Sequence, residues 1–263
     1  MGLLFNAALF RTSIDRARLT PLVVVLAVLG LSASCASYAL RGAVLMGDIS
    51  GLYDPVILGL LAETPVGTAL LLRCIGFGLI LGVAYFPSLP QGLSVAAGLV
   101  ILWSFTQIGH VFDLGSLLLQ AVLLIHLVIV AFWIGILIPL GRLAKDIRTL
   151  DQAAQLGHEF GRMAAIAIPI LLISGIALAY LLVGQPSGIS TPYGLALLIK
   201  LVAVILLLIL GAINKLFFVR KLRNGDKSAA RHLTLSISGE WAVFCVIFAA
   251  TAIITSIFTP PGF

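Results

Sequence analysis

His126 lies inside an apolar run, residues 120–145, that reads QAVLLIHLVIVAFWIGILIPLGRLAK. Burying an imidazole in apolar surroundings is costly unless it has a partner, so His126 is a candidate functional group. The side chain could bind a metal ion, bind a haem iron or relay a proton. A neutral histidine that is hydrogen-bonded to a neighbouring helix is the structural alternative. Trp133, seven residues further on, falls on the same face of a helix.

A second set of polar side chains precedes this run. Four of them recur at helical spacing: Trp103, Thr106, Gln107 and His110. His110 is three residues from Asp113, so these two could share a metal ion at the outer mouth of a pathway toward His126. The alternative for His110 is an interfacial side chain that is exposed to water.

Soft donor atoms are also present, in the four residues Cys35, Cys74, Cys245 and Met46. Thiolate and imidazole ligands suit copper better than hard cations, so the cysteines could join His126 as ligands. A free cysteine is also a common small buried residue, and Met46 at the end of a span is more simply interfacial. Three cysteines are too few and too deeply placed for a disulfide framework.

Four further polar residues interrupt the expected membrane spans: Arg73, Lys200, Asn214 and Glu240. Arg73 and Glu240 have opposite charges and compatible depths, so an ion pair between them would relieve the cost of burying both. Such a pair is either purely structural or moves during transport. Lys200 lies nearer the outer face, where its amine can reach the headgroup region.

The composition requires that helices in a membrane position these side chains. Of 263 residues, 61% are hydrophobic and only 10% are charged, and the mean hydropathy is +1.18. The apolar runs reach the roughly 20 residues that a helix needs to cross about 30 Å of hydrocarbon, whereas a barrel strand alternates over about 10. We therefore predict an all-α, polytopic transmembrane bundle that forms one domain over residues 1–263. Seven spans are expected, at about 20–46, 65–86, 91–110, 116–140, 158–183, 193–219 and 232–258.

Charge orients these spans. The net charge is +6, and the basic residues collect before the first span, after the fourth, and between the sixth and seventh. They indicate topology and contact with lipid rather than with nucleic acid. The positive-inside rule then makes residues 1–19 cytoplasmic and the C-terminus external. A signal peptide ending at Cys35 is disfavoured, because Ser32 stands where an aliphatic residue is expected and the apolar character continues.

Common catalytic motifs are absent from the sequence. It contains no Walker loop, HExxH, GxSxG, dinucleotide-binding fingerprint or CxxC. We therefore do not expect an enzyme.

Several segments, taken in order, resemble the copper resistance D (CopD) family of bacterial inner-membrane proteins. They are TPVGTALLLR at 64–73, GH at 109–110, HLVIVAFWIGILIPL at 126–140, FGRMAAIAIPILLISGIALA at 160–179, TPYGLALLIK at 191–200, GAINK at 211–215 and GEWAVFCVIFAATAIITSIFTPP at 239–261.

The resemblance implies a bundle of eight helices that carries copper across the inner membrane, often beside a small periplasmic copper-binding protein (CopC-like). The positions that match the family motifs are His110, His126, Trp133, Arg73, Lys200, Asn214 and Glu240. The family usually has one more helix at the start, and residues 2–11 look like its tail. With that helix the N-terminus would lie outside, while every later span keeps its orientation. No fused copper-binding domain or Met-rich tract is visible, so a separate partner would deliver the metal.

We predict copper transport or uptake across the cytoplasmic membrane, contributing to copper homeostasis or resistance. His110 at the outer mouth and His126 near the midplane are the candidate ligands, because a mobile cation needs weak, successive sites. The expected partners are copper ion, membrane lipid and a CopC-like protein, and not nucleic acid. A membrane redox protein that binds haem through an intramembrane histidine is one alternative, and a membrane sensor or scaffold without transport is another.

Overall fold

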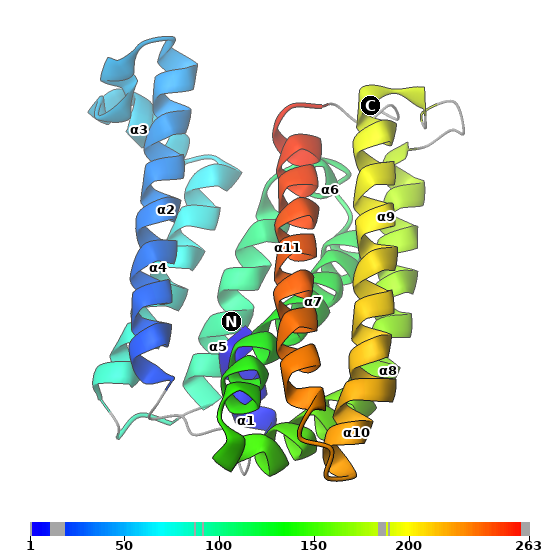
Figure 1. Ribbon diagram of the computed structural model, residues 1–263. Helices are drawn as coiled ribbons and strands as arrows, with labels where there is room; N and C mark the ends of the chain where they lie inside the picture. Colours follow the sequence, from blue (N-terminus) through cyan, green and yellow to red (C-terminus); the bar gives the residue numbers. More distant parts are fainter. Residues whose placement is uncertain are drawn as a thin grey trace. The chain divides into compact units, whose positions relative to one another are not determined.

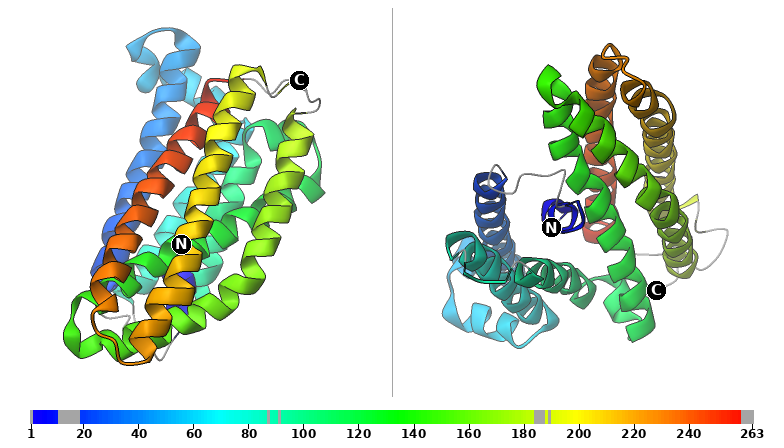
Figure 2. Two further views of the ribbon diagram at one scale, coloured as in Figure 1. Left: turned by 45° about the vertical axis from the view of Figure 1, so that its right-hand side comes forward. Right: turned by 90° about the horizontal axis from the view of Figure 1, so that it is seen from below.

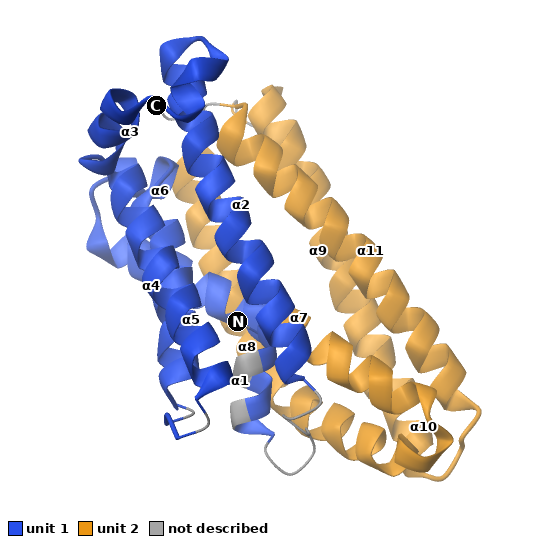
Figure 3. Cartoon of the chain, turned by 90° about the vertical axis from the view of Figure 1, so that its left-hand side faces the viewer, with its two compact units in different colours: residues 1–11, 15–132 blue, residues 12–14, 133–263 orange. Residues whose placement is uncertain are grey.

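The computed structural model describes residues 2–10, 19–86, 88–90, 92–183, 188 and 190–258, and these residues form helices joined by short connections (Figure 1). They belong to two compact units. Unit 1 comprises residues 1–11 and 15–132, and unit 2 comprises residues 12–14 and 133–263 (Figure 3). The boundary falls within one helix, α7, between Phe132 and Trp133.

Unit 1 contains the N-terminal helices and the first half of α7. Its elements are α1 (Gly2–Leu9), α2 (Thr20–Met46), η1 (Ile49–Leu52), α3 (Pro55–Ala62), α4 (Pro65–Tyr85), α5 (Gly92–Ser104), η2 (Phe105–Gln107), α6 (His110–Asp113) and the start of α7 (Leu117–Lys145). Unit 2 continues with the rest of α7, η3 (Ile147–Thr149), α8 (Leu150–Val183), α9 (Pro192–Ile213), the π-helix η5 (Asn214–Phe218), α10 (Val219–Arg223) and α11 (Ala229–Ser256).

Six of the described helical segments are long and apolar enough to cross a membrane. They correspond to predicted spans 1, 2, 4, 5, 6 and 7, so the all-α membrane bundle is confirmed. The predicted third span is shorter, because α5 ends at Ser104 and a 3₁₀ turn follows it. Ile108 is then extended, and Gly109 adopts a φ of 85°, a left-handed conformation that glycine takes without strain. The predicted helical stripe from Trp103 to His110 is therefore broken.

The fifth span also differs from its prediction. We expected it to begin at about residue 158, but α8 begins at Leu150. Its first turns are amphipathic: Ala153 and Leu156 are fully buried, whereas Asp151 and Gln152 are exposed. Because the polar residues lie on one face, they do not end the helix. Residue 158, where the span was expected to begin, therefore lies well inside α8.

Helices α2 and α4 lie side by side in unit 1 (Figures 1 and 3). α2 ends at Gly47, whose φ of 72° closes the helix. Asp54 and Thr64 then cap α3 and α4 through their side chains. Asp48 accepts hydrogen bonds from the Ser50 backbone and side chain, and these lower the pKa of the Asp48 carboxyl. The two helices can pack closely because Gly30 faces Phe77 without an intervening Cβ.

Helix α1 is held within unit 1 by a buried asparagine. The Asn6 amide nitrogen donates to the backbone oxygen of Phe132 at 2.8 Å and to that of Gly2 at 2.9 Å. The side chain of Asn6 is fully buried. Residues 2–9 are thus helical, as expected for the segment that resembles the family's first helix.

Helices α9 and α11 run side by side in unit 2 (Figures 1 and 2). α11 carries a continuous buried face, with Leu233, Ile237, Phe244 and Ile247 among its members. In the same unit, α8 packs against α10, and Gly157 of α8 faces Val219 of α10.

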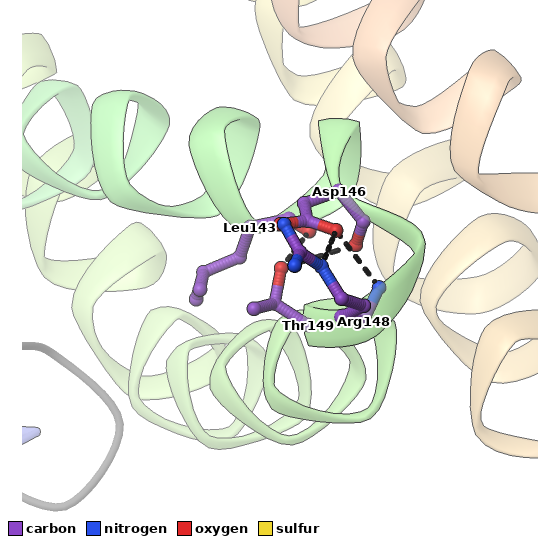
Figure 4. Close-up of polar contacts among 4 residues, drawn as sticks. All are labelled: Leu143, Asp146, Arg148 and Thr149. Carbon is purple, nitrogen blue, oxygen red and sulfur yellow. Dashed lines mark hydrogen bonds and ion pairs between the residues drawn. The ribbon is translucent and has the colours of Figure 1, made fainter.

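A hydrogen-bonded corner joins α7 to α8 (Figure 4). Asp146 accepts from the Arg148 backbone at 3.0 Å and forms a two-point ion pair with the Arg148 guanidinium, with both contacts at 3.2 Å. Thr149 donates to the backbone oxygen of Leu143 at 2.8 Å. The ion pair is largely exposed, so we attribute the shape of the corner to the side-chain cap and not to the charges.

Candidate functional site

A buried carboxyl group forms the centre of the polar network in unit 2. Glu240 on α11 is 2% exposed and accepts one hydrogen bond at each oxygen. Trp133 Nε1, from α7, donates to Oε2 at 2.8 Å, and Asn214 Nδ2, from η5, donates to Oε1 at 2.5 Å. Each donor is uncharged, and each comes from a different helix. The network therefore ties three helices together at a group that is costly to bury.

The indole of Trp133 is also fixed by packing. It meets the Phe244 ring edge-on, with 6.4 Å between ring centroids. On its other side, α9 approaches so closely that a Cβ on Gly211 would lie 2.8 Å from Trp133 Cζ2. Glycine at position 211 thus provides the space for the indole that Glu240 binds.

Replacing Gly211 with alanine should displace this indole. In an unhindered helix the change would be favourable by about 1 kcal/mol. Here we expect a loss of about 1–3 kcal/mol, because the new methyl group overlaps a ring that cannot move without losing its hydrogen bond. Unfolding of the purified protein in detergent would measure it. Gly141→Ala is the matched control, since a Cβ there meets Ile237 at an ordinary 3.6 Å. Equal stability of the two variants would contradict the close approach.

The π-helix η5 contributes one donor to the hydrogen-bond network of Glu240. η5 begins at Asn214, the residue that binds Glu240. π-helical turns are rare and are frequently found at functional sites. Lys215, the next residue, extends its stem past Gly161 of α8. Lys200, which also matches a family motif, lies half-buried on α9.

Arg73 has partners within unit 1. Its Nε donates to Ser104 Oγ at 3.0 Å, and its guanidinium lies 4.5 Å from the centroid of the Phe105 ring. Ser104 is fully buried and donates in turn to the Ile101 backbone oxygen at 2.6 Å. Arg73 belongs to unit 1 and Glu240 to unit 2, so the ion pair between them stays a prediction. Each of the two groups is bound by neutral partners of its own unit.

The outer polar stripe folds into a turn. Thr106 is fully buried and receives a hydrogen bond from Gln107 Nε2 at 3.0 Å. The same Gln107 amide approaches Gln120 Oε1 of α7 at 3.5 Å. His110 and Asp113 begin and end the one-turn helix α6 that follows, with His110 half-buried and Asp113 exposed.

His126 lies half-buried on α7, in unit 1. Trp133 is on the same helix but belongs to unit 2. Among the described residues, no three of the types His, Cys, Asp and Glu come together as a potential metal cluster. Metal ligation by His110 and His126 therefore stays a prediction.

The soft donors are divided among several places. Cys35 on α2 and Cys74 on α4 are neighbours in unit 1, where their thiols lie close enough to interact. Cys245 is exposed on α11 in unit 2. Met46 ends α2, and its sulfur lies 3.5 Å from Ser50 Oγ, at an exposed position.

Basic residues gather at one end of unit 2. Arg223, at the end of α10, reaches His158 Nδ1 of α8 at 3.0 Å. His232, near the start of α11, stacks on Phe218 with 5.7 Å between the ring centroids. In the adjoining turn, hydrogen bonds from the Ser228 hydroxyl and backbone lower the pKa of the Asp226 carboxyl.

The sequence did not reveal which side chains would meet. It marked Trp133, Asn214 and Glu240 separately as polar groups in spans, but their mutual contacts depend on the packing of three helices. Ser104 and Gln120 were not singled out at all. Ser104 and Gln120 could have been found by the same criterion as the others, because each is a polar residue in an apolar segment.

These features define a multi-pass α-helical membrane protein with polar networks inside its helical units. The model of the family "Copper resistance protein D" matches residues 154–254. The model "Copper resistance protein D-like, N-terminal domain" matches residues 1–116. The chain therefore belongs to the copper resistance D family.

Two curated relatives extend this comparison. The inner membrane protein YebZ of Escherichia coli (strain K12) is 28% identical over 136 residues, which is 51% of this chain and 47% of YebZ. The copper transport protein CutJ of Bacillus subtilis (strain 168) is 28% identical over 141 residues, 52% of this chain and 25% of CutJ. The matched regions thus span about half the length of the first relative and a quarter of the second. No solved structure matches the chain.

Proposed function

We propose that this protein carries copper across the cytoplasmic (inner) membrane of a bacterium, as uptake that contributes to copper homeostasis or resistance. The observation that carries the proposal is membership of the copper resistance D family in a chain whose apolar α7 contains His126. The relative CutJ is named a copper transport protein, which favours transport over a purely structural role.

His110 and His126 are the proposed successive ligands. Both belong to unit 1, one at the start of α6 and the other well inside α7. At about 1.5 Å per residue, His126 falls roughly 15 Å from the end of its span, near the middle of the membrane. Single imidazoles bind copper weakly enough for the ion to move on, whereas a closed site with four ligands would retain it.

The orientation that we propose places the basic end of unit 2 in the cytoplasm. The turns between α7 and α8 and between α10 and α11 both carry arginine or lysine, and Arg223 of the second turn reaches His158 of α8. By the positive-inside rule this end is cytoplasmic and the C-terminus external. Copper would then arrive at the outer side, from a separate CopC-like periplasmic protein.

Copper accumulation in cells tests the role of the histidines. In a host without copper uptake of its own, we expect His126→Ala to reduce accumulation to the level of cells that lack the protein, and His110→Ala to reduce it in part. His232→Ala is the matched control, because it removes an exposed histidine that stacks on Phe218 near the start of α11. Protein amounts in the membrane must be equal. Unchanged accumulation in both test variants would disprove the ligand assignment, and a haem Soret band in the purified protein would favour a redox function instead.

A further inference from the structure

Two cysteines that are far apart in the sequence meet inside unit 1. α2 and α4 are antiparallel neighbours, and Gly30 faces Phe77 across their interface. Cys35 follows Gly30 by five residues on α2, and Cys74 precedes Phe77 by three residues on α4. The two thiols lie close enough to interact with each other. Cys35 is exposed and Cys74 is half-buried, so the pair is formed by packing and is accessible at one of its two sulfurs.

The chemistry of this pair is selective. Soft thiolate sulfur favours Cu(I), and Cu(I) is stable with only two sulfur ligands in a linear arrangement. Zn²⁺ requires four ligands, and Cu(II) prefers a square of nitrogen and oxygen donors. Among the described residues no third His, Cys, Asp or Glu completes a larger cluster with the two thiols. Two sulfurs on adjacent helices therefore fit Cu(I) better than Cu(II) or Zn²⁺.

Positive charge is available on the same two helices to balance an anionic complex. Two thiolates and one Cu(I) ion carry a net charge of minus one, which is costly in a membrane without compensation. Arg41 on α2 and Arg73 on α4 lie close enough to interact electrostatically with each other. Arg73 adjoins Cys74 in sequence and is held by Ser104 and Phe105. The two helices that carry the thiols therefore also carry two guanidinium groups.

We propose that Cys35 and Cys74 form a two-coordinate Cu(I) site. On binding, each thiol loses its proton and each sulfur forms one bond to the metal, so two protons are released for each Cu(I) bound and no electron is transferred. The identity of the metal rests on the proposed copper function, but the site does not require that His110 or His126 bind copper.

Competition with a colorimetric Cu(I) chelator, without oxygen, tests the site in the purified full-length protein. The wild type should retain one Cu(I). Cys35→Ser and Cys74→Ser should each weaken retention by roughly 100-fold or more, since even an outer-shell partner of a metal ligand is worth roughly 10- to 100-fold. Cys245→Ser, which removes the thiol of unit 2, should bind like the wild type. Equal retention by all three variants, or displacement of Cu(I) by an equal concentration of Zn²⁺, would overturn the proposal.

Thiol protection in the unmodified protein avoids any dependence on the folding of the variants. Labelling with a maleimide, followed by mass spectrometry, should show that Cu(I) protects Cys35 and Cys74 and leaves Cys245 reactive. Protection of Cys245 alone, or of none of the three, would contradict the site. These assays are separate from accumulation in cells. If accumulation does not depend on His126 but Cu(I) binding depends on both thiols, the histidine path fails and the thiol site stands.

Discussion

Replacing Trp133 with alanine is expected to lower the free energy of unfolding by about 3–5 kcal/mol, the range for truncating a buried tryptophan. Trp133 is 5% exposed, and its indole packs against Phe244 and the backbone of Gly211. In a membrane, packing of this kind rather than the hydrophobic effect holds helices together, so the cavity itself is the cost. Truncation also leaves Glu240 Oε2 without its donor. Reversible unfolding in mixed micelles would measure the loss.

Trp133→Phe separates packing from hydrogen bonding. Phenylalanine fills most of the space but cannot donate, so we expect a smaller loss of about 1–2 kcal/mol. A double-mutant cycle with Glu240→Gln then reports the coupling between positions 133 and 240, because changes at residues in contact are not additive. Strict additivity would show that the hydrogen bond contributes nothing. A loss below about 1 kcal/mol for Trp133→Ala would contradict the packed position of the indole.

Gly76→Leu should destabilise unit 1 by about 3 kcal/mol or more, at or above the usual cost of overpacking. A Cβ at position 76 would overlap Ile101 Cγ1 and would lie 2.9 Å from the backbone oxygen of Ala97. Ala97 is fully buried and Ile101 is 3% exposed, so α5 has no free space into which to retreat. The four extra carbons would force α4 and α5 apart.

Gly78→Leu provides the matched control on the same helix. It makes the same chemical change two residues away, where a Cβ has nothing within 4 Å. We expect stability close to that of the wild type, or slightly higher because leucine favours the helix. Thermal unfolding of both variants in one detergent gives the comparison. Similar melting temperatures for the two would show that α4 and α5 are not in close contact at Gly76.

Hydropathy predicted most of the helices, and local start signals in the sequence agree with where two of them begin. Thr64 followed by Pro65, and Thr191 followed by Pro192, are strong start signals, and α4 and α9 begin at these prolines. The predicted third span was wrong at its end, where the sequence stays apolar but the backbone leaves the helix. Residues 105–109 remain fairly apolar, but the conformation of Gly109 prevents a continuous helix there.

The partners of buried polar groups could not be predicted in the same way. The prediction matched Glu240 with Arg73 because their charges and depths were compatible, and it did not foresee the neutral donors that each group has within its own unit. The two donors to Glu240 are distant in the sequence: Trp133 lies 107 residues before it and Asn214 lies 26 residues before it. Such contacts depend on helix rotation, which a single sequence does not specify. The contact of Cys35 with Cys74 escaped prediction for the same reason, although both were recognised as soft donors.

The π-helix η5 has a consequence for the sixth span as a whole. A wider turn changes the angular position of everything that follows it relative to everything before it. Gly211 and Asn214 at the end of α9 face the Trp133 and Glu240 network, while Val219 just beyond η5 packs on Gly157 of α8. The helix before η5 and the helix after it therefore contact different neighbours, and the π-helical turn sets the rotation of one relative to the other. Deleting a single residue there would bring the two halves into one continuous α-helical phase, and the span could then satisfy only one set of neighbours.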